Sequence, residues 1–292
     1  MKRQFDAASV AAQLPPVMVF RPEVPLAPLV LASPHSGRQY PQAFLAAARL
    51  DLPGLRRSED SFVDELFQAA PALGAPIVVA NFPRAYCDAN REKWELDPAM
   101  FLAPLPDYVN TTSARVGAGL GTIARIVASG EPIYRHKLDF AEAQARIAGS
   151  WQPFHDALQA EIDATLARFG RCLLIDCHSM PRSSQGRGEK VDIVLGDAHG
   201  TTCAPDVVRD VEAALVGLGF RVRRNDPYAG GYITRHYGRP REAVNALQIE
   251  ICRSLYMDER HIERLAGFGA VQSRLTGLIA GLVAENCHFS PA

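Results

Sequence analysis

The sequence predicts an α/β protein, a single domain in which a mixed, largely parallel sheet is flanked by helices. Short apolar runs rich in branched residues, which are typical of buried strands, recur along the chain. Segments with helical periodicity separate these runs. No internal repeat and no low-complexity linker interrupts the 292 residues, so we expect residues 1–292 to form one domain.

Five runs are expected to form the strands of this sheet. They are continuously apolar, which predicts that each strand is covered on both faces and that helices lie on both sides of the sheet. The runs lie at residues 28–32, 76–80, 172–176, 191–195 and 246–251.

Four longer segments have the apolar spacing of helices and are expected to pack on the sheet. They cover residues 61–73, 140–169, 205–218 and 259–283. Long irregular stretches rich in Pro, Gly, Arg and Asn lie at residues 88–112, 180–190 and 225–241. Open α/β sheets bind ligands beyond the carboxyl ends of their strands, so we expect these loops to converge on a site there.

Composition and charge narrow the functional class. The 31 Lys+Arg and 32 Asp+Glu give a net charge of -1, without the basic excess of a protein that binds nucleic acid or an anionic membrane. No signal-like segment and no run of about 18 apolar residues is present, so no membrane span is expected. Six scattered cysteines without a CxxC pair favour a reducing cytoplasm. The expected partner is a small molecule.

Two histidines follow predicted strands in similar contexts. His35 lies in Ser-Pro-His-Ser-Gly and His178 in Asp-Cys-His-Ser. Imidazole suits zinc, and a catalytic zinc usually has three protein ligands and a water. A single histidine of this kind could equally be a hydrogen-bonded loop residue, but the repeated context favours a metal site. Asp176 lies on the same side of an extended chain as His178 and is expected to orient that imidazole.

The third metal ligand is expected from the acidic pair Glu59 and Asp60, with Asp60 favoured. Asp60 also has the position of an N-cap for a helix that begins near Phe62, and the sequence leaves capping and coordination both open.

Glu250 is the expected general base. It lies in an apolar strand, where a charged residue is costly unless it is paired or functional. A carboxylate near a metal can take a proton from the attacking water and deliver it to the leaving group. The alternative is a structural ion pair with Arg253.

Basic and amide side chains in three loops predict an anion-binding site. Arg84, Asn90 and Arg91 follow the predicted strand at residues 76–80, and Arg235 and His236 lie in a glycine-rich loop. Guanidinium groups bind carboxylates through two parallel hydrogen bonds, and Gly-Gly lets backbone N–H groups approach an anion. A substrate with one or two carboxylates would suit this set.

Together these motifs resemble the N-formylglutamate amidohydrolase family. The resemblance extends from about residue 28 to 255 and rests on residues 33–37, 60–66, 81–91, 176–179 and 247–251. It implies a phosphorylase/hydrolase-like fold related to zinc carboxypeptidases and the aspartoacylase group. The implied roles are zinc ligands for His35 and His178, binding of the substrate carboxylate for Asn90 and Arg91, and the base for Glu250.

The sequence departs from the carboxypeptidase pattern at one position. That pattern has a glutamate three residues after the first histidine, and here the residue is Arg38, so the carboxylate ligand is expected to be Asp60 or Glu59. The resemblance implies N-formyl-L-glutamate as substrate, cleaved to formate and glutamate in histidine degradation. Related N-acyl or N-formimino acidic amino acids are the alternative.

The expected mechanism uses one zinc ion on His35, Asp60 and His178, with Arg84 or Arg235 stabilising the oxyanion and His236 assisting at the anion site. Two rival interpretations remain at this point. One is a cysteine amidase that uses Cys177 or Cys87, although Cys177 and His178 should point to opposite faces of a strand. The other is a metal-stabilised binding protein without turnover.

Overall fold

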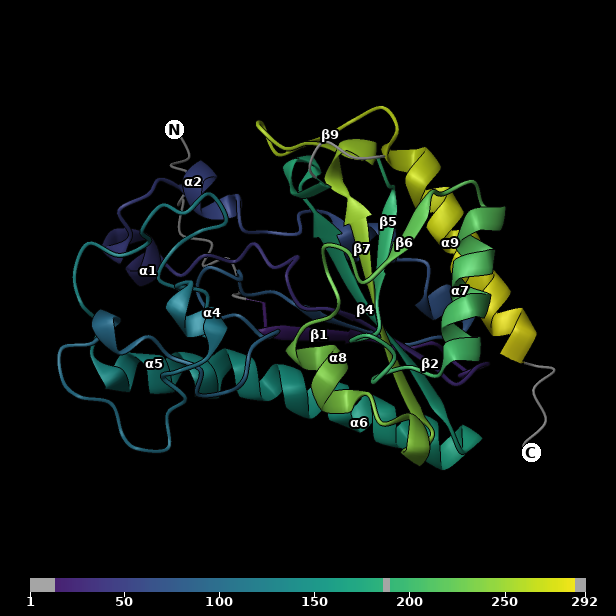
Figure 1. The fold of residues 1–292 in the computed structure, drawn as a ribbon, viewed down its shortest axis with the longest axis horizontal. Coiled ribbons are helices and arrows are strands. Elements are labelled where there is room, and N and C mark those ends of the chain that lie inside the picture. The colour runs from purple at the N-terminus through teal and green to yellow at the C-terminus, as the bar shows by residue number, and fades with distance from the viewer. Residues whose placement is uncertain (1–13, 186–189, 287–292) are drawn as a thin grey trace, which may run out of the picture.

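A mixed sheet of seven strands carries the fold (Figure 1). The computed structural model describes residues 14–185 and 190–286. The strands, in their spatial order, are β1 (Val17–Phe20), β3 (Ile77–Ala80), β2 (Leu29–Ser33), β4 (Cys172–Met180), β7 (Val244–Cys252), β5 (Ile193–Gly196) and β6 (Val222–Arg224).

The centre of the sheet is parallel and its margins are antiparallel to it. β3, β2, β4 and β7 run in one direction. At one edge β1 pairs antiparallel with β3, and at the other β5 pairs antiparallel with β7 while β6 runs parallel to β5. The prediction of a mixed, largely parallel sheet is confirmed. The four parallel strands end at the same edge of the sheet, and the loops that leave them meet there.

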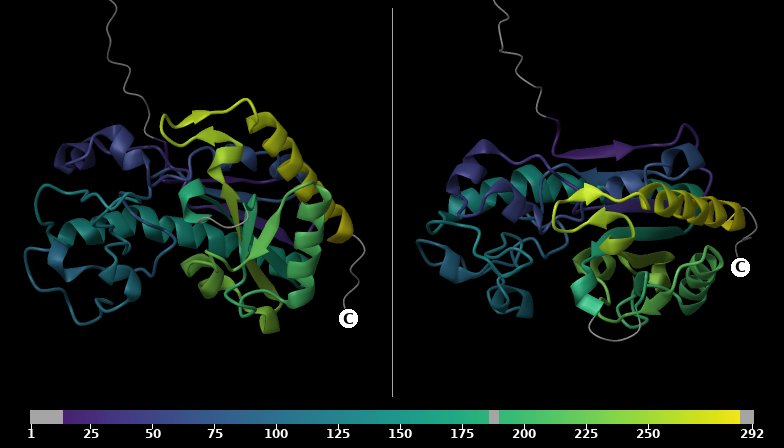
Figure 2. Two further views of the ribbon diagram at one scale, coloured as in Figure 1. Left: turned by 45° about the horizontal axis from the view of Figure 1, so that its top comes forward. Right: turned by 90° about the horizontal axis from the view of Figure 1, so that it is seen from above.

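Helices cover both faces of the sheet, as the apolar strands predicted (Figures 1 and 2). One face carries α5 (Phe140–Arg146), a π-helical turn (Ile147–Trp151), the long α6 (Gln152–Phe169) and α8 (Tyr232–Tyr237). The other carries α3 (Val63–Leu66), α7 (Pro205–Gly217) and α9 (Phe268–Asn286). Among the described residues, no helix combines the length and apolar character needed to cross a membrane.

Alternate residues of each central strand enter different cores. In β4, Leu173 and Ile175 pack with the cluster that includes α7 and α9, while Cys172 and Leu174 pack with α6. Side chains of a strand alternate between faces, so His178 shares its face with Leu174 and Cys177 does not. This alternation decides which polar side chains of β4 and β7 reach the same side of the sheet.

Short elements complete the molecule. In Figure 1, α1, α2 and α4 lie at one end of the sheet, away from α7 and α9. These and the remaining elements are α1 (Gln42–Ala47), α2 (Leu52–Arg56), α4 (Ala114–Gly117), the 3-10 turns Pro71–Leu73, Pro98–Met100, Arg182–Gln185, Pro240–Glu242 and Arg253–Leu255, and the two-stranded pair β8 (Met257–Asp258) and β9 (Glu263–Arg264).

Two predicted helices are wrong in part. Residues 61–73 form one α-helical turn, further turns and a 3-10 turn, because the backbone turns left-handed at Phe62 (φ 69°) and Pro71 has no N–H to continue a helix. Residues 259–264 belong to a turn and β9, and the last helix starts at Phe268.

The edge strands β1 and β6 were not predicted. Both are short and only partly buried, so neither has the continuous apolar run that marks the central strands. The irregular stretch predicted at residues 180–190 is a 3-10 turn at Arg182–Gln185, and residues 186–189 lie outside the described part of the chain.

Candidate active site

A cavity of about 450 Å³ lies at the carboxyl ends of the parallel strands. The chain reaches it from β2 through His35, from β4 through His178 and from β7 through Glu250. The loops after β3 and before α8 form further walls. Strand ends and loops therefore converge where the sequence placed the site.

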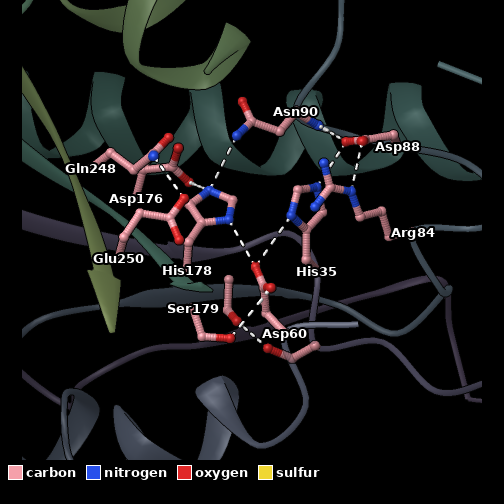
Figure 3. Close-up of polar contacts among 12 residues, drawn as sticks. His35, Asp60, Arg84, Asp88, Asn90, Asp176, His178, Ser179, Gln248 and Glu250 are labelled. Carbon is pink, nitrogen blue, oxygen red and sulfur yellow. Dashed lines mark hydrogen bonds and ion pairs between the residues drawn. The ribbon is translucent and has the colours of Figure 1, made fainter. Parts of the chain in front are cut away.

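Three buried ligand groups meet at one point of the cavity wall (Figure 3). The Oδ2 atom of Asp60 lies 3.0 Å from Nδ1 of His178 and 3.3 Å from Nδ1 of His35. Nδ1 of His35 is buried and has no hydrogen-bond partner among the described residues. Ligand atoms bound to one tetrahedral zinc at 2.0–2.1 Å lie about 3.3 Å apart, so these residues fit a shared metal ion.

The far nitrogen of each imidazole faces a second carboxylate. Nε2 of His35 lies 2.7 Å from Oδ1 of Asp88, and Nε2 of His178 lies 2.9 Å from Oδ1 of Asp176. Asp176 and His178 lie within ion-pair distance, but neither oxygen of Asp176 makes a well-directed hydrogen bond within the described residues. Such carboxylates fix the ring orientation, here with each Nδ1 toward Oδ2 of Asp60. Asp176 lies as predicted, whereas the role of Asp88 was missed although it is in the same motif as Asn90.

Asp60 is held through its second oxygen. Arg253 donates from Nη2 to Oδ1 (2.9 Å), and Ser179 also donates to that oxygen (3.3 Å). Burial opposes ionisation of Asp60, but the hydrogen bond from His178 and the nearby His35 and Arg253 outweigh it and hold its pKa well below the usual range. Asp60 is therefore an anion with one oxygen directed at the two histidines. Arg253 was predicted only as a partner of Glu250, and this contact with Asp60 was missed.

The capping role considered for Asp60 does not occur. The N-cap position of α3 is Phe62, and the first-turn N–H of Asp64 donates to the hydroxyl of Ser36 (3.1 Å) rather than to Asp60. Glu59, the alternative ligand, accepts hydrogen bonds from Tyr40 (2.8 Å), Ser61 (2.7 Å) and Arg56. Its oxygens are thus satisfied in a separate network, and it is not part of the His35–Asp60–His178 group.

Glu250 lies beside this group. It is in register with His178 on the neighbouring parallel strand, is 7% exposed and lines the cavity. Burial raises the pKa of Glu250 to about 7, against the opposing effect of His178. Its Oε1 accepts a hydrogen bond from Gln248 (2.8 Å). Arg253 pairs with Asp60 instead, so the alternative of a Glu250–Arg253 ion pair is not what the described residues form.

The loop after β3 brings three of the predicted anion-binding residues into the cavity wall. Nε of Arg84 lies 2.9 Å from Oδ2 of Asp88. Arg91 donates to the carbonyls of Leu120 (2.7 Å) and Asn90 (2.6 Å). Burial lowers the pKa of Arg91 to about 10, so it remains protonated at neutral pH.

Asn90 lies above the histidines (Figure 3). Its Oδ1 accepts from the backbone N–H of Ile233 (2.8 Å), which fixes its Nδ2 toward Nε2 of His178 (3.1 Å). Beneath this loop, His155 of α6 bonds the carbonyl of Ala89 and the hydroxyl of Tyr237, each at 2.8 Å. His155 thus supports the loop from the core.

The glycine-rich loop supplies one of its two predicted residues. Arg235 lines the cavity from α8. His236 does not: its ring stacks on Tyr232 (centroids 4.9 Å apart) on the outer side of the helix. The prediction that His236 assists at the anion site is corrected, because consecutive helical residues point in directions about 100° apart. Two further arginines that line the cavity, Arg115 and Arg253, were not predicted there.

A sequence model of the N-formylglutamate amidohydrolase family matches residues 27–257. The chain belongs to this family. It is 30% identical over 241 residues to an N-formylglutamate deformylase of Pseudomonas putida (80% of this chain, 82% of that protein) and 31% identical over 240 residues to one of Pseudomonas aeruginosa (80% and 83%). A crystal structure of N-formylglutamate amidohydrolase from Ralstonia eutropha superposes with a TM-score of 0.89 at 39% identity, covering 94% of this chain and 99% of that one.

The prediction of an amidohydrolase of this family is confirmed, and the geometry removes the thiol alternative. Cys177 packs in the core on the opposite side of the sheet from His178, and burial raises its pKa well above the usual range. Burial likewise raises the pKa of Cys87 to about 12. Neither thiol provides the thiolate that a nucleophilic cysteine needs.

Proposed function

We propose that this amidohydrolase is a zinc enzyme that cleaves the formyl amide of N-formyl-L-glutamate to formate and L-glutamate. The observation that carries the proposal is the convergence of His35, Asp60 and His178 beside the buried Glu250. The relatives named N-formylglutamate deformylase support the substrate. Cytoplasmic histidine degradation is the proposed setting.

His35, Asp60 and His178 would hold the zinc through Nδ1, Oδ2 and Nδ1. Their fit rests on the unpartnered Nδ1 of His35 and on the two carboxylates behind the imidazoles. A zinc ion held there would lower the pKa of a bound water to about 7 and polarise the formyl carbonyl.

Glu250 moves the proton in the proposed reaction. Its carboxylate accepts a proton from the water whose oxygen bonds to the formyl carbon. It then delivers that proton to the amide nitrogen as the C–N bond breaks, which leaves formate and the free amine of glutamate. Burial raises the pKa of Glu250 in the metal-free protein, and this buried position favours a group that must release its proton as well as accept it.

The basic residues bind and stabilise negative charge. Asn90 and Arg91 are proposed to hold the α-carboxylate. Arg84, anchored by Asp88, faces the oxygen that becomes negative as the carbonyl is attacked, with Arg235 as the alternative for this role.

The test is removal and return of the metal. Dialysis against a chelator should abolish formate release from N-formyl-L-glutamate, and one equivalent of Zn²⁺ per chain should restore it. Full activity in a protein free of metal by elemental analysis would refute the zinc proposal. N-formimino-L-glutamate and N-acetyl-L-glutamate, assayed in parallel, decide whether a related acyl group is the true one.

Glu250→Gln separates an enzyme from a metal-binding protein without turnover. The variant should retain zinc and bind L-glutamate as the wild type does, while kcat falls roughly 100- to 10,000-fold because the proton carrier is lost. Glu263→Gln, at an exposed position on β9, is the matched control and should leave kcat unchanged. An unchanged kcat in Glu250→Gln would show that Glu250 is not the general base.

A further inference from the structure

Two of the arginines that line the active-site cavity have no acidic partner among the described residues. Arg84 pairs with Asp88, and Arg253 pairs with Asp60. Arg91 donates to two carbonyl oxygens through Nε and Nη1, and its Nη2 lies 3.7 Å from Oδ2 of Asp88. The two others, for which no side-chain hydrogen bond or ion pair occurs within residues 14–185 and 190–286, are Arg115 and Arg235.

Arg115 lines the same cavity as Arg91. It is an exposed residue of α4, the single helical turn at Ala114–Gly117. The carbonyl of Leu120, five residues on, accepts the hydrogen bond from Nε of Arg91. The charge of Arg115 is close enough to oppose protonation of Arg91, together with burial and Arg84. An anion between these guanidinium groups would relieve their repulsion.

The wall that carries Arg115 is fixed in place. Ser113 caps α4 by accepting from the N–H of Val116 (3.0 Å), and its hydroxyl donates to Glu95. Behind it, Gly121 packs so closely on Glu95 that a Cβ atom would lie 2.2 Å from the carbonyl oxygen. The N–H of Thr122 also donates to that carbonyl. A rigid wall with an unpartnered arginine is an arrangement that favours a specific anion over a mobile counterion.

N-formyl-L-glutamate has two carboxylates, and Asn90 with Arg91 accounts for one. The α-carboxylate is one bond from Cα and must lie near the scissile amide. The side-chain carboxylate is farther from that amide and must lie farther from His35, Asp60 and His178. Arg115 lines the cavity, is exposed and has a guanidinium without a partner among the described residues, which suits this second group.

We infer that Arg115 binds the side-chain carboxylate of the substrate and thereby makes the enzyme selective for acidic over neutral N-formyl amino acids. This inference rests on the proposed function. It assigns to Arg115 a role in specificity and none in the bond-breaking step.

The test compares N-formyl-L-glutamate with its neutral isostere N-formyl-L-glutamine in wild type and in Arg115→Met. Loss of a charge-assisted hydrogen bond should lower kcat/KM for N-formyl-L-glutamate about 10- to 100-fold, mainly through KM. The value for N-formyl-L-glutamine should change less than about 3-fold, within the range of a surface substitution. Arg115→Lys, which keeps the charge without the guanidinium fork, should recover part of the loss.

Arg209→Met provides the matched control. Arg209 is an exposed arginine of α7, paired with its neighbour Asp210, and both substrates should be hydrolysed as in wild type. Equal losses for the two substrates in Arg115→Met, or no loss for either, would overturn the role assigned to Arg115 but not the proposed function. Failure of the wild-type enzyme to hydrolyse either substrate would overturn the proposed function, and the inference with it.

Discussion

Burial keeps the carboxyl group of Glu250 protonated at pH values where an exposed glutamate is ionised. In an unfolded chain it would lose its proton near pH 4.3, whereas in the folded, metal-free protein its pKa is about 7. The unfolded state therefore releases this proton first as the pH rises. Glu250 lowers the free energy of unfolding progressively between these two pKa values, and below the lower one it has no such effect.

The metal-free Glu250→Gln variant should accordingly be more stable than metal-free wild type at pH 8, with a difference that shrinks toward pH 4. Gln retains the shape of the side chain and has no charge to bury. Urea unfolding in the presence of a chelator at pH 4.5, 6 and 8 measures the trend. A difference that is independent of pH would show that the pKa of Glu250 is the same in the folded and unfolded states.

Arg253 and Ser179 fix one oxygen of Asp60, which leaves the other for the proposed zinc ion. Arg253→Met should therefore weaken zinc binding about 10- to 100-fold, the usual effect of removing a residue that orients a ligand. Competition with a chromophoric chelator measures the affinity. In the Co²⁺ form, the visible spectrum should also change, because a released Asp60 can bind through both oxygens. Arg260→Met, an exposed residue of the turn between β8 and β9, is the control.

At the scale of elements, the register of β4 on β7 brings together residues of the candidate site. His178 lies opposite Glu250 and Asp176 opposite Gln248, all on one face of two parallel strands. Of these residues, Asp176, His178 and Glu250 could be anticipated from the sequence because each interrupts or ends an apolar run. Asp88 and Arg253 could not, since their roles depend on contacts with His35 and Asp60 that only the folded chain creates.

The same contrast between local sequence pattern and tertiary contacts decides which helices and strands could be predicted. The central strands were located within a few residues because burial on both faces requires an unbroken apolar run. The prediction of one helix over residues 61–73 failed because the left-handed backbone at Phe62 and the tight turns after it present an apolar face without a continuous helix. Tertiary packing, rather than local spacing, decides such segments.

The start of α8 packs directly on Asn90. A Cβ atom at Gly231 would lie 2.3 Å from the Asn90 side chain, so Gly231→Ala must displace that amide. We expect KM for N-formyl-L-glutamate to rise about 10-fold or more, since small displacements of binding groups are costly. Steady-state kinetics measure the change. Gly281→Ala in α9, where an added Cβ meets nothing within 4 Å, should leave KM unchanged; an equal rise in both variants would refute a specific role for Gly231.

At the scale of the whole molecule, one sheet joins the two apolar cores. Each central strand contributes alternate residues to the cluster with α6 and to the cluster with α7 and α9. Unfolding of the sheet would therefore expose the apolar residues of both clusters at once. We propose that the chain is a single domain that unfolds as one cooperative unit. The proposed metal site is formed from the ends of β2 and β4 and the loop before α3, so zinc binding should stabilise the whole domain against unfolding.

Thermal unfolding of the metal-free protein should show one transition, with the same midpoint by far-ultraviolet circular dichroism and by fluorescence of Trp94 and Trp151, which lie on the α6 face. Saturating zinc should move both signals together, because a ligand that binds only the folded state at about 1,000 times its Kd adds about 4 kcal/mol to the free energy of unfolding. In His35→Ala the zinc shift should disappear while the single transition remains. Two separate midpoints would divide the chain into independent folding units and contradict a single domain.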